Sequence, residues 1–194
     1  MPVLEGIAPV LHVEAFDAGQ DNARTSRRTF AELSERLDRG DVAAQRLARL
    51  DLRLRAAGAR VHDHFEGRVP PVLPIRLLTP TPFRLHGANS MAKAALDGMG
   101  LAHPAPGEPT EWGFVQRRVE DLARFEDVIV AQIEPFPQHD ALQDTPMWQF
   151  MPFVQDGRFA TTWAVWTFGG VFSLGYLAEA FADAIVQPDP KADR

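Results

Sequence analysis

The chain has 194 residues, of which 45 % are hydrophobic and 24 % are charged. This apolar content can bury a core in one or two small domains and argues against a disordered chain. The net charge of −6 argues against a nucleic-acid-binding surface, which needs clustered positive charge. Because the sequence has no cysteine, it offers no disulfide, no iron–sulfur ligands and no thiol nucleophile.

The sequence contains no obvious membrane or export signal. No apolar run reaches the roughly 18 residues of a membrane-spanning helix. The first residues lack the basic region and cleavage site of a signal peptide. A periplasmic location would therefore need a leader upstream of Met1.

The N-terminal part predicts one strand and two helices. Alternation of apolar and polar residues predicts a strand over Val10–Phe16, followed by a loop over Asp17–Asp21. A helix is expected over Thr25–Leu37, ending near Gly40.

A second, longer helix is expected from a cap at Asp41 to about Phe65. Its apolar residues recur at spacings of three to five and are Val42, Leu47, Leu50, Leu54, Ala57, Val61 and Phe65. The expected length suits a helix that bridges two lobes, and equally a long surface helix of a single domain. Gly58 within it costs about 1 kcal/mol relative to alanine.

The remaining chain alternates strands and helices. Strands are predicted at 72–78, 84–86 and 128–133, and helices at 90–99, 119–125 and 173–186. Ser90 is expected to cap the 90–99 helix and Gly100 to end it. This order predicts a three-layer α/β lobe.

The segment from Thr145 to Tyr176 is unusually rich in large rings. A helical turn over Met147–Met151 is expected to stop at Pro152. After the Asp156-Gly157 turn, a strand is expected over Arg158–Val165.

Three tryptophans and one phenylalanine of this segment divide into two groups. Trp148 and Trp163 are interpreted as core residues. Trp166 and Phe168, beside a Gly-Gly turn, are predicted to project to one side at the mouth of the sheet, where ligands of α/β folds bind. Trp112, with its flexible neighbour Gly113, fits a core plug and a ligand platform equally well.

Catalytic and metal-binding motifs are scarce. The sequence has no Gly-x-Ser-x-Gly, no phosphate-binding glycine loop and no His-Glu-x-x-His. The strongest metal candidate is His62-Asp63-His64-Phe65-Glu66. On a helix only His62 and Glu66 would share a face, so a solvated helix end is the preferred interpretation.

Several short motifs, in order, resemble the C-terminal lobe of periplasmic ferric-siderophore-binding proteins of ABC importers, most of all the ferrichrome or ferric-hydroxamate branch. They are His86-Gly87-Ala88-Asn89-Ser90, Gly98-Met99-Gly100, Trp112-Gly113-Phe114, Thr145–Gln149, Met151–Val154, Asp156–Phe159, Ala164-Val165-Trp166 and Ser173-Leu174. The resemblance covers residues 70–187 well and residues 1–66 loosely.

The resemblance implies a helical-backbone periplasmic binding protein that holds a ferric hydroxamate-type siderophore and delivers it to an ABC importer permease. The implied ligand-binding residues are Trp112, Phe114, Trp166, Thr167 and Phe168. At Thr167 the family usually has another aromatic residue. Because the siderophore already satisfies its iron, neither a cofactor nor protein metal ligands are implied. The implied location is the periplasm or the cell surface.

The resemblance also implies a division into a remnant of the N-terminal lobe (1–40), an interlobe spine helix (41–66) and a C-terminal α/β lobe (67–194). Family members carry a further N-terminal segment, whose arginine and tyrosine meet the iron-chelating oxygens. We therefore expect half a cleft, and self-association through the uncovered N-terminal part. A cobalamin- or haem-binding relative, a small α/β hydrolase and an interaction domain are the alternatives.

Overall fold

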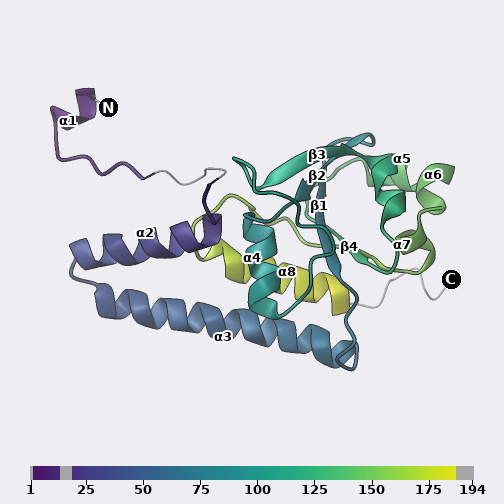
Figure 1. Cartoon of the computed structure of the whole chain (residues 1–194), viewed down its shortest axis with the longest axis horizontal. Coiled ribbons are helices and arrows are strands. Elements are labelled where there is room, and N and C mark those ends of the chain that lie inside the picture. Colours follow the sequence, from purple (N-terminus) through teal and green to yellow (C-terminus); the bar gives the residue numbers. More distant parts are fainter. Residues whose placement is uncertain (1, 14–18, 187–194) are drawn as a thin grey trace.

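The computed structural model describes residues 2–13 and 19–186, and its centre is a five-stranded sheet with helices on both faces (Figure 1). The strands are β1 (Val72–Leu77), β2 (Pro82–His86), β3 (Phe114–Arg118), β4 (Ile129–Gln132) and β5 (Phe159–Thr161). The helices are α1 (Pro2–Glu5), α2 (Asn22–Arg36), α3 (Gly40–His64), α4 (Met91–Met99), the 3₁₀ helix η1 (Val119–Arg124), α5 (His139–Gln143), α6 (Pro146–Gln149), α7 (Pro152–Gln155) and α8 (Ser173–Val186).

The strand order is β3-β2-β1-β4-β5. The β1–β2 and β2–β3 pairs are antiparallel, whereas β1–β4 and β4–β5 are parallel. The central strand β1 is almost entirely buried, as its apolar run predicts.

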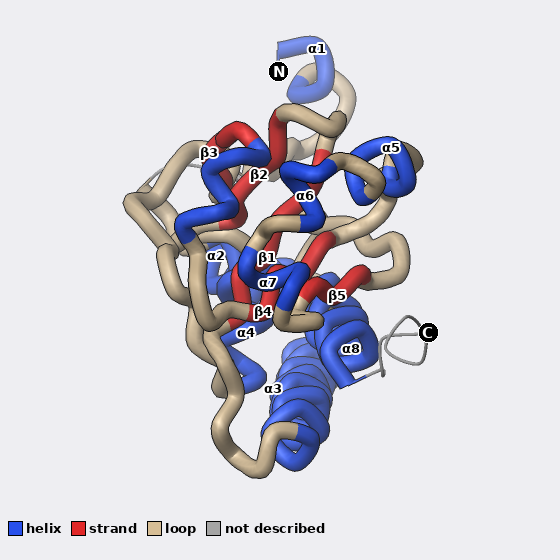
Figure 2. The backbone as a smooth tube through the Cα atoms, turned by 90° about the vertical axis from the view of Figure 1, so that its right-hand side faces the viewer, coloured by secondary structure: helices blue, strands red, loops and turns tan. Residues whose placement is uncertain are grey.

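Two apolar clusters fill the spaces above and below the sheet. On one face, Val72, Ile129 and Ala131 pack with the buried sides of α3, α4 and α8. On the other, Leu73, Ile75 and their neighbours pack against η1 and the short helices α5–α7. Figure 2 shows these helices on opposite sides of the strands. The predicted three-layer α/β architecture is confirmed.

Helix α3 lies along α8 and α4, with α2 beside its first half (Figure 1). Leu50, Leu54, Ala57 and Val61 of the predicted stripe are buried, whereas Val42 is exposed. The helix begins at Gly40 after Arg39, so Asp41 lies in its first turn and is not its cap. A Cβ at Gly58 would lie 2.0 Å from the Met99 carbonyl oxygen, so glycine lets α3 and α4 approach closely.

The N-terminal residues differ from the prediction. Residues 10–13 of the expected 10–16 strand form no strand, and residues 14–16 lie outside the described chain, as do residues 17 and 18 of the expected loop. Figure 1 shows α1 and the following residues extending away from the helices and the sheet. Their apolar side chains, including Val3 and Ile7, are exposed. In the described chain no strand lies beside residues 10–13, so their backbone groups cannot form the hydrogen bonds of a sheet.

Local helix signals are largely confirmed. The Ser90 hydroxyl accepts a hydrogen bond from the Lys93 N–H, and Gly100 adopts a left-handed conformation with φ 74°. Helix α8 has the predicted bounds, and residues 119–124 form a 3₁₀ helix. Pro152 does not only end a helical turn: it is the first residue of α7, a position where no N–H is needed.

Two predictions in the ring-rich segment are wrong. The expected 158–165 strand is reduced to Phe159–Thr161, since the ladder ends after Thr162, whose hydroxyl bonds the next carbonyl. Trp148 is buried, as predicted, but Trp163 is 44 % exposed. Trp163 follows the shortened strand and therefore lies outside the core.

Within residues 2–13 and 19–186, no helix combines the length and apolar character needed to cross a membrane.

Candidate ligand-binding site

Four aromatic residues from two distant segments meet in one place, and we call them the aromatic cluster: Trp112, Phe114, Trp166 and Phe168. The ring centroid of Phe168 lies 5.9 Å from that of Phe114, 6.4 Å from Trp112 and 6.0 Å from Trp166. All three contacts are edge-to-face, the arrangement that aromatic rings favour. The structure thus brings together four of the five residues predicted for the site.

The cluster is open to solvent. Trp166 is 64 % exposed and Trp112 is 51 % exposed, while Phe114 and Phe168 are half-buried. Large rings with this much free surface are not core residues, so the core-plug alternative for Trp112 does not hold. Adjacent exposed rings form a surface suited to an apolar partner or ligand.

The segment that carries Trp112 and Phe114 is clamped to the turn between β2 and α4. The Asn89 side-chain amide donates to the Thr110 carbonyl at 2.7 Å and accepts from the Thr110 N–H at 3.1 Å. The Gly87 N–H donates to the Gly113 carbonyl at 2.8 Å. Gly113 has φ +73°, and a Cβ there would lie 2.9 Å from the Ser90 Cα. Glycine is required at this position for both reasons.

The second segment runs from the end of β5 to the start of α8. Because β5 ends at Thr161, Trp166 and Phe168 lie on a connecting loop and not at the strand end that the sequence predicted. A Cβ at Gly169 would lie 1.8 Å from the Ser173 hydroxyl, so the turn into α8 needs glycine there. The Gly170 carbonyl oxygen accepts a hydrogen bond from the Ser173 N–H at 2.9 Å, which ties the end of the loop to the first residue of α8.

Thr167 does not share the exposure of its neighbours. It is 2 % exposed, and its hydroxyl has no hydrogen-bond partner among the described residues. Thr167 lies in the turn that follows Trp166, and its side chain is buried there while the Trp166 ring is exposed. Thr167, one of the five residues predicted to bind the ligand, is therefore not part of the exposed surface.

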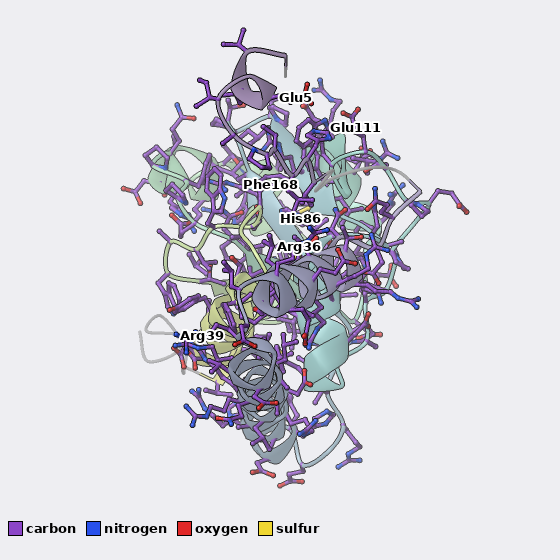
Figure 3. The ribbon with its side chains drawn as sticks, turned by 90° about the vertical axis from the view of Figure 1, so that its left-hand side faces the viewer. Glu5, Arg36, Arg39, His86, Glu111 and Phe168 are labelled. Carbon is purple, nitrogen blue, oxygen red and sulfur yellow. The ribbon has the colours of Figure 1, made fainter. Side chains whose placement is uncertain are left out.

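Polar residues that the sequence analysis did not assign to the site border the cluster. The Arg84 guanidinium carbon lies 4.4 Å from the centroid of the Phe114 ring, a cation–π contact. His86 packs edge-on against the same ring at 6.2 Å. Figure 3 shows His86 and Phe168 close to each other in this view, above α2.

His86 is almost completely buried. Burial, the largest cause, and the nearby Arg76, Arg84 and His103 together lower its pKa to about 3. Its Nε2 atom has no hydrogen-bond partner among the described residues. A neutral imidazole is therefore held beside the aromatic cluster at neutral pH.

A groove adjoins the aromatic cluster on its α2 side. It has a volume of about 520 Å³ and is mostly apolar. Phe168 borders both the groove and the cluster. The other large apolar residues lining the groove are Val13, Phe30, Leu33, Val171, Phe172 and Tyr176.

The metal candidate of the sequence analysis is not assembled into a site. His62 Nε2 lies 3.2 Å from the Gly100 carbonyl oxygen at the end of α4. Among residues 2–13 and 19–186, no three His, Asp or Glu side chains are grouped so as to hold a metal ion.

Comparison with known proteins places this architecture in a family. No protein-family model matches the chain. The iron(3+)-hydroxamate-binding protein FhuD of Escherichia coli (strain K12) is 29 % identical over 172 residues, which are 88 % of this chain and 57 % of that protein. The structure of the siderophore-binding protein FhuD from Vibrio cholerae, with Fe³⁺-Desferal bound, superposes with a TM-score of 0.90 at 32 % identity, covering 95 % of this chain and 70 % of that one. The chain belongs to the FhuD family of siderophore-binding proteins.

A more distant FhuD-type structure shares the fold. It is a Bacillus subtilis periplasmic binding protein component of a ferrichrome ABC transporter, with a TM-score of 0.66 and 14 % identity over 97 % of this chain and 71 % of that one. The resemblance seen in the sequence is confirmed, and these FhuD relatives are binding proteins rather than enzymes. The chain spans little more than half the length of the E. coli FhuD protein.

Proposed function

We propose that the chain binds a ferric hydroxamate-type siderophore at the aromatic cluster, as part of a binding protein that serves iron uptake. The observation that carries this proposal is the cluster of four contacting rings, in which Trp112 and Trp166 are exposed and Phe114 and Phe168 are half-buried. The proposal is also supported by a relative: the chain is 32 % identical to a FhuD protein whose structure was solved with Fe³⁺-Desferal bound.

The chemistry of such a ligand suits this surface. A hydroxamate siderophore supplies all the iron ligands itself, so the protein holds the complex by apolar contact, a few hydrogen bonds and shape. The exposed faces of Trp112 and Trp166 provide such contact area. Thr167, buried behind the rings, would act through their placement and not by direct contact.

The same proposal extends to partner and location. The B. subtilis relative is a component of a ferrichrome ABC transporter, so we propose an ABC importer permease as the partner that receives the ligand. We propose the periplasm or the cell surface as the place of action.

The binding test uses tryptophan fluorescence. Titration with Fe³⁺-Desferal should quench the emission, because Trp112 and Trp166 would lie against the bound ferric complex. Replacing each by alanine should weaken binding by about 1–3 kcal/mol, the scale of burying a large ring.

Trp163→Ala is the matched control, since Trp163 is an exposed tryptophan that makes none of the ring contacts of the cluster. It should bind with the affinity of the unaltered chain. An affinity of the Trp112→Ala/Trp166→Ala double variant equal to that of the control would contradict the proposal.

We also propose that the chain has no catalytic activity of its own. Nucleophilic and acid–base chemistry requires a base and an orienting group at the reacting atom. Around the cluster the buried imidazole of His86 is neutral at neutral pH, and its Nε2 atom has no hydrogen-bond partner among the described residues, so no nucleophile is paired with that nitrogen. Turnover of a generic ester that one substitution in the cluster abolishes would overturn this statement.

Self-association is a further part of the proposal. Val3 and Ile7 are 79 % and 78 % exposed, and Val13 reaches the border of the apolar groove beside α2. Apolar surface of this kind drives pairing with another chain. Light scattering at micromolar concentration should give a mass above that of one chain, reduced in a Val3→Ser/Ile7→Ser variant. A monodisperse single-chain mass would contradict it.

A further inference from the structure

Two arginines stand directly opposite each other on neighbouring strands. Arg76 on β1 and Arg84 on β2 are register partners in an antiparallel pair, so their side chains leave the same face of the sheet. Like charges in this position repel each other and destabilise the pair. Among the described residues, no carboxylate oxygen lies within 4 Å of either guanidinium.

The arginine pair borders the aromatic cluster. Arg84 lies over the Phe114 ring, and Phe114 contacts Phe168. The Arg84 Nε atom is enclosed and has no hydrogen-bond partner among the described residues. His86, on the same strand face and 2 % exposed, likewise leaves Nε2 without a partner in the described chain. Buried polar atoms of this kind normally have partners, so several together mark a place for a polar ligand group.

The other charged groups nearby do not neutralise the pair. Glu134 is the carboxylate whose charge reaches Arg76, but its oxygens lie 2.6 Å from His139 Nε2 and 2.7 Å from the Phe136 N–H. Burial lowers the pKa of Arg76, the neighbouring Arg84 lowers it further, and Glu134 offsets only part of this. His86 and His103 both have lowered pKa values, chiefly through burial.

We propose that Arg76 and Arg84 bind a carboxylate of the ligand, so that the chain prefers ferric hydroxamates that carry a free carboxylate. This inference rests on the proposed function of the aromatic cluster. A ferric tris-hydroxamate core is neutral overall, because three hydroxamate charges balance the iron. Two adjacent guanidinium groups therefore need a further anion, and their planar donors match the two oxygens of a carboxylate.

The experiment compares three ligands that share one iron core. They are Fe³⁺-Desferal, which ends in an ammonium group, its N-acetyl derivative, which is neutral, and its N-succinyl derivative, which ends in a carboxylate. Affinities are measured by calorimetry at low ionic strength. The N-succinyl complex should bind about tenfold or more tightly than the N-acetyl complex, the effect of one charged hydrogen bond. The ammonium form should bind most weakly.

Substitutions of the two arginines test whether they cause the preference for the carboxylate-bearing complex. Arg84→Gln and Arg76→Gln should each reduce the difference in affinity between the N-succinyl and N-acetyl complexes, with a smaller effect on the N-acetyl complex than on the N-succinyl complex. Arg117→Gln is the matched control for net charge, because Arg117 is exposed on β3 and pairs with Phe83, on the opposite face of the sheet. It should preserve the preference.

The outcomes separate the two proposals. Equal affinity for all three complexes overturns the carboxylate inference and leaves the proposed function intact, whereas failure of all three to bind overturns both. Equal weakening of all three by Arg84→Gln also overturns the inference, since the arginine would then act on the shared core. Because each glutamine relieves like-charge repulsion, neither variant should lower the thermal unfolding midpoint. A lower midpoint in both variants would show that the two arginines stabilise the fold and would overturn the inference.

Discussion

Two arginines of the helix layer have carboxylate partners, whereas the two beside the aromatic cluster have none among the described residues. Between α3 and α8, Arg53 pairs with Glu179 and Arg60 pairs with Asp183. Beside the cluster, Arg76 and Arg84 face each other without a carboxylate partner in the described chain. The apolar residues follow the same division.

Helix α8 buries Leu177 and Phe181 completely, whereas Trp112 and Trp166 are largely exposed. A region that has satisfied its charges and buried its apolar surface contributes to stability. A region that has done neither is available to a ligand, and it is the less stable part of the fold. Under the proposed function, the division places ligand binding at the aromatic cluster and stability in the α3–α8 layer.

The largest expected effect is on stability in the helix layer. Phe181→Ala should lower the free energy of unfolding by about 3–5 kcal/mol, because it leaves a cavity in the core. Trp166→Ala should change the free energy of unfolding by no more than about 0.5 kcal/mol. Urea unfolding of both variants measures the free energy of unfolding. Similar decreases in the two variants would contradict the division between a stabilising helix layer and a ligand-binding cluster.

The next effect is acid sensitivity through His86. Its pKa is about 3 in the folded chain, below the 6.5 of an unperturbed histidine. The unfolded chain therefore binds the extra proton first, and stability falls as pH decreases from about 6.5 toward 3. The slope is about 1.4 kcal/mol per pH unit.

Between pH 6.5 and 5 the unaltered chain should thus lose about 2 kcal/mol from this histidine. His86→Asn should show a flatter profile over that range, and His64→Asn, at an exposed position ending α3, should not. Identical profiles for His86→Asn and the unaltered chain would show that His86 does not titrate in this way.

The smallest effect concerns the paired arginines. Arg53 and Glu179 are 34 % and 38 % exposed, so solvent screens their attraction. A double-mutant cycle with Arg53→Met and Glu179→Gln should give a coupling of about 1 kcal/mol or less. Ligand affinity should not change in either variant, and a large loss of binding would mean that the two regions are not separate.

Much of the fold follows from local signals in the sequence. Ser90 and Gly100 delimit α4, and the continuous apolar run at 72–78 predicts the buried central strand. These features depend on neighbouring residues and need no knowledge of the tertiary structure. The 158–165 strand was overestimated because strand length depends on where the partner β4 ends.

The candidate site was predictable only in part. The rings stood out by their density and by the family resemblance, so Trp112, Phe114, Trp166 and Phe168 could be named. Trp163 was misplaced because aromatic content alone favours burial. The arginine pair was missed because cross-strand neighbours follow from the β1–β2 register, which no short motif encodes.

Hydrogen exchange of the backbone amides, with and without the gallium complex of Desferal, tests the central claim most directly. Gallium replaces iron without changing the shape or charge of the complex. Ligand binding should slow exchange at residues 112–114 and 166–168 first and most strongly, with smaller changes in α3 and α8 that reflect only the gain in global stability. No change at either segment, or protection confined to the groove beside α2, would contradict the assignment of ligand binding to the aromatic cluster.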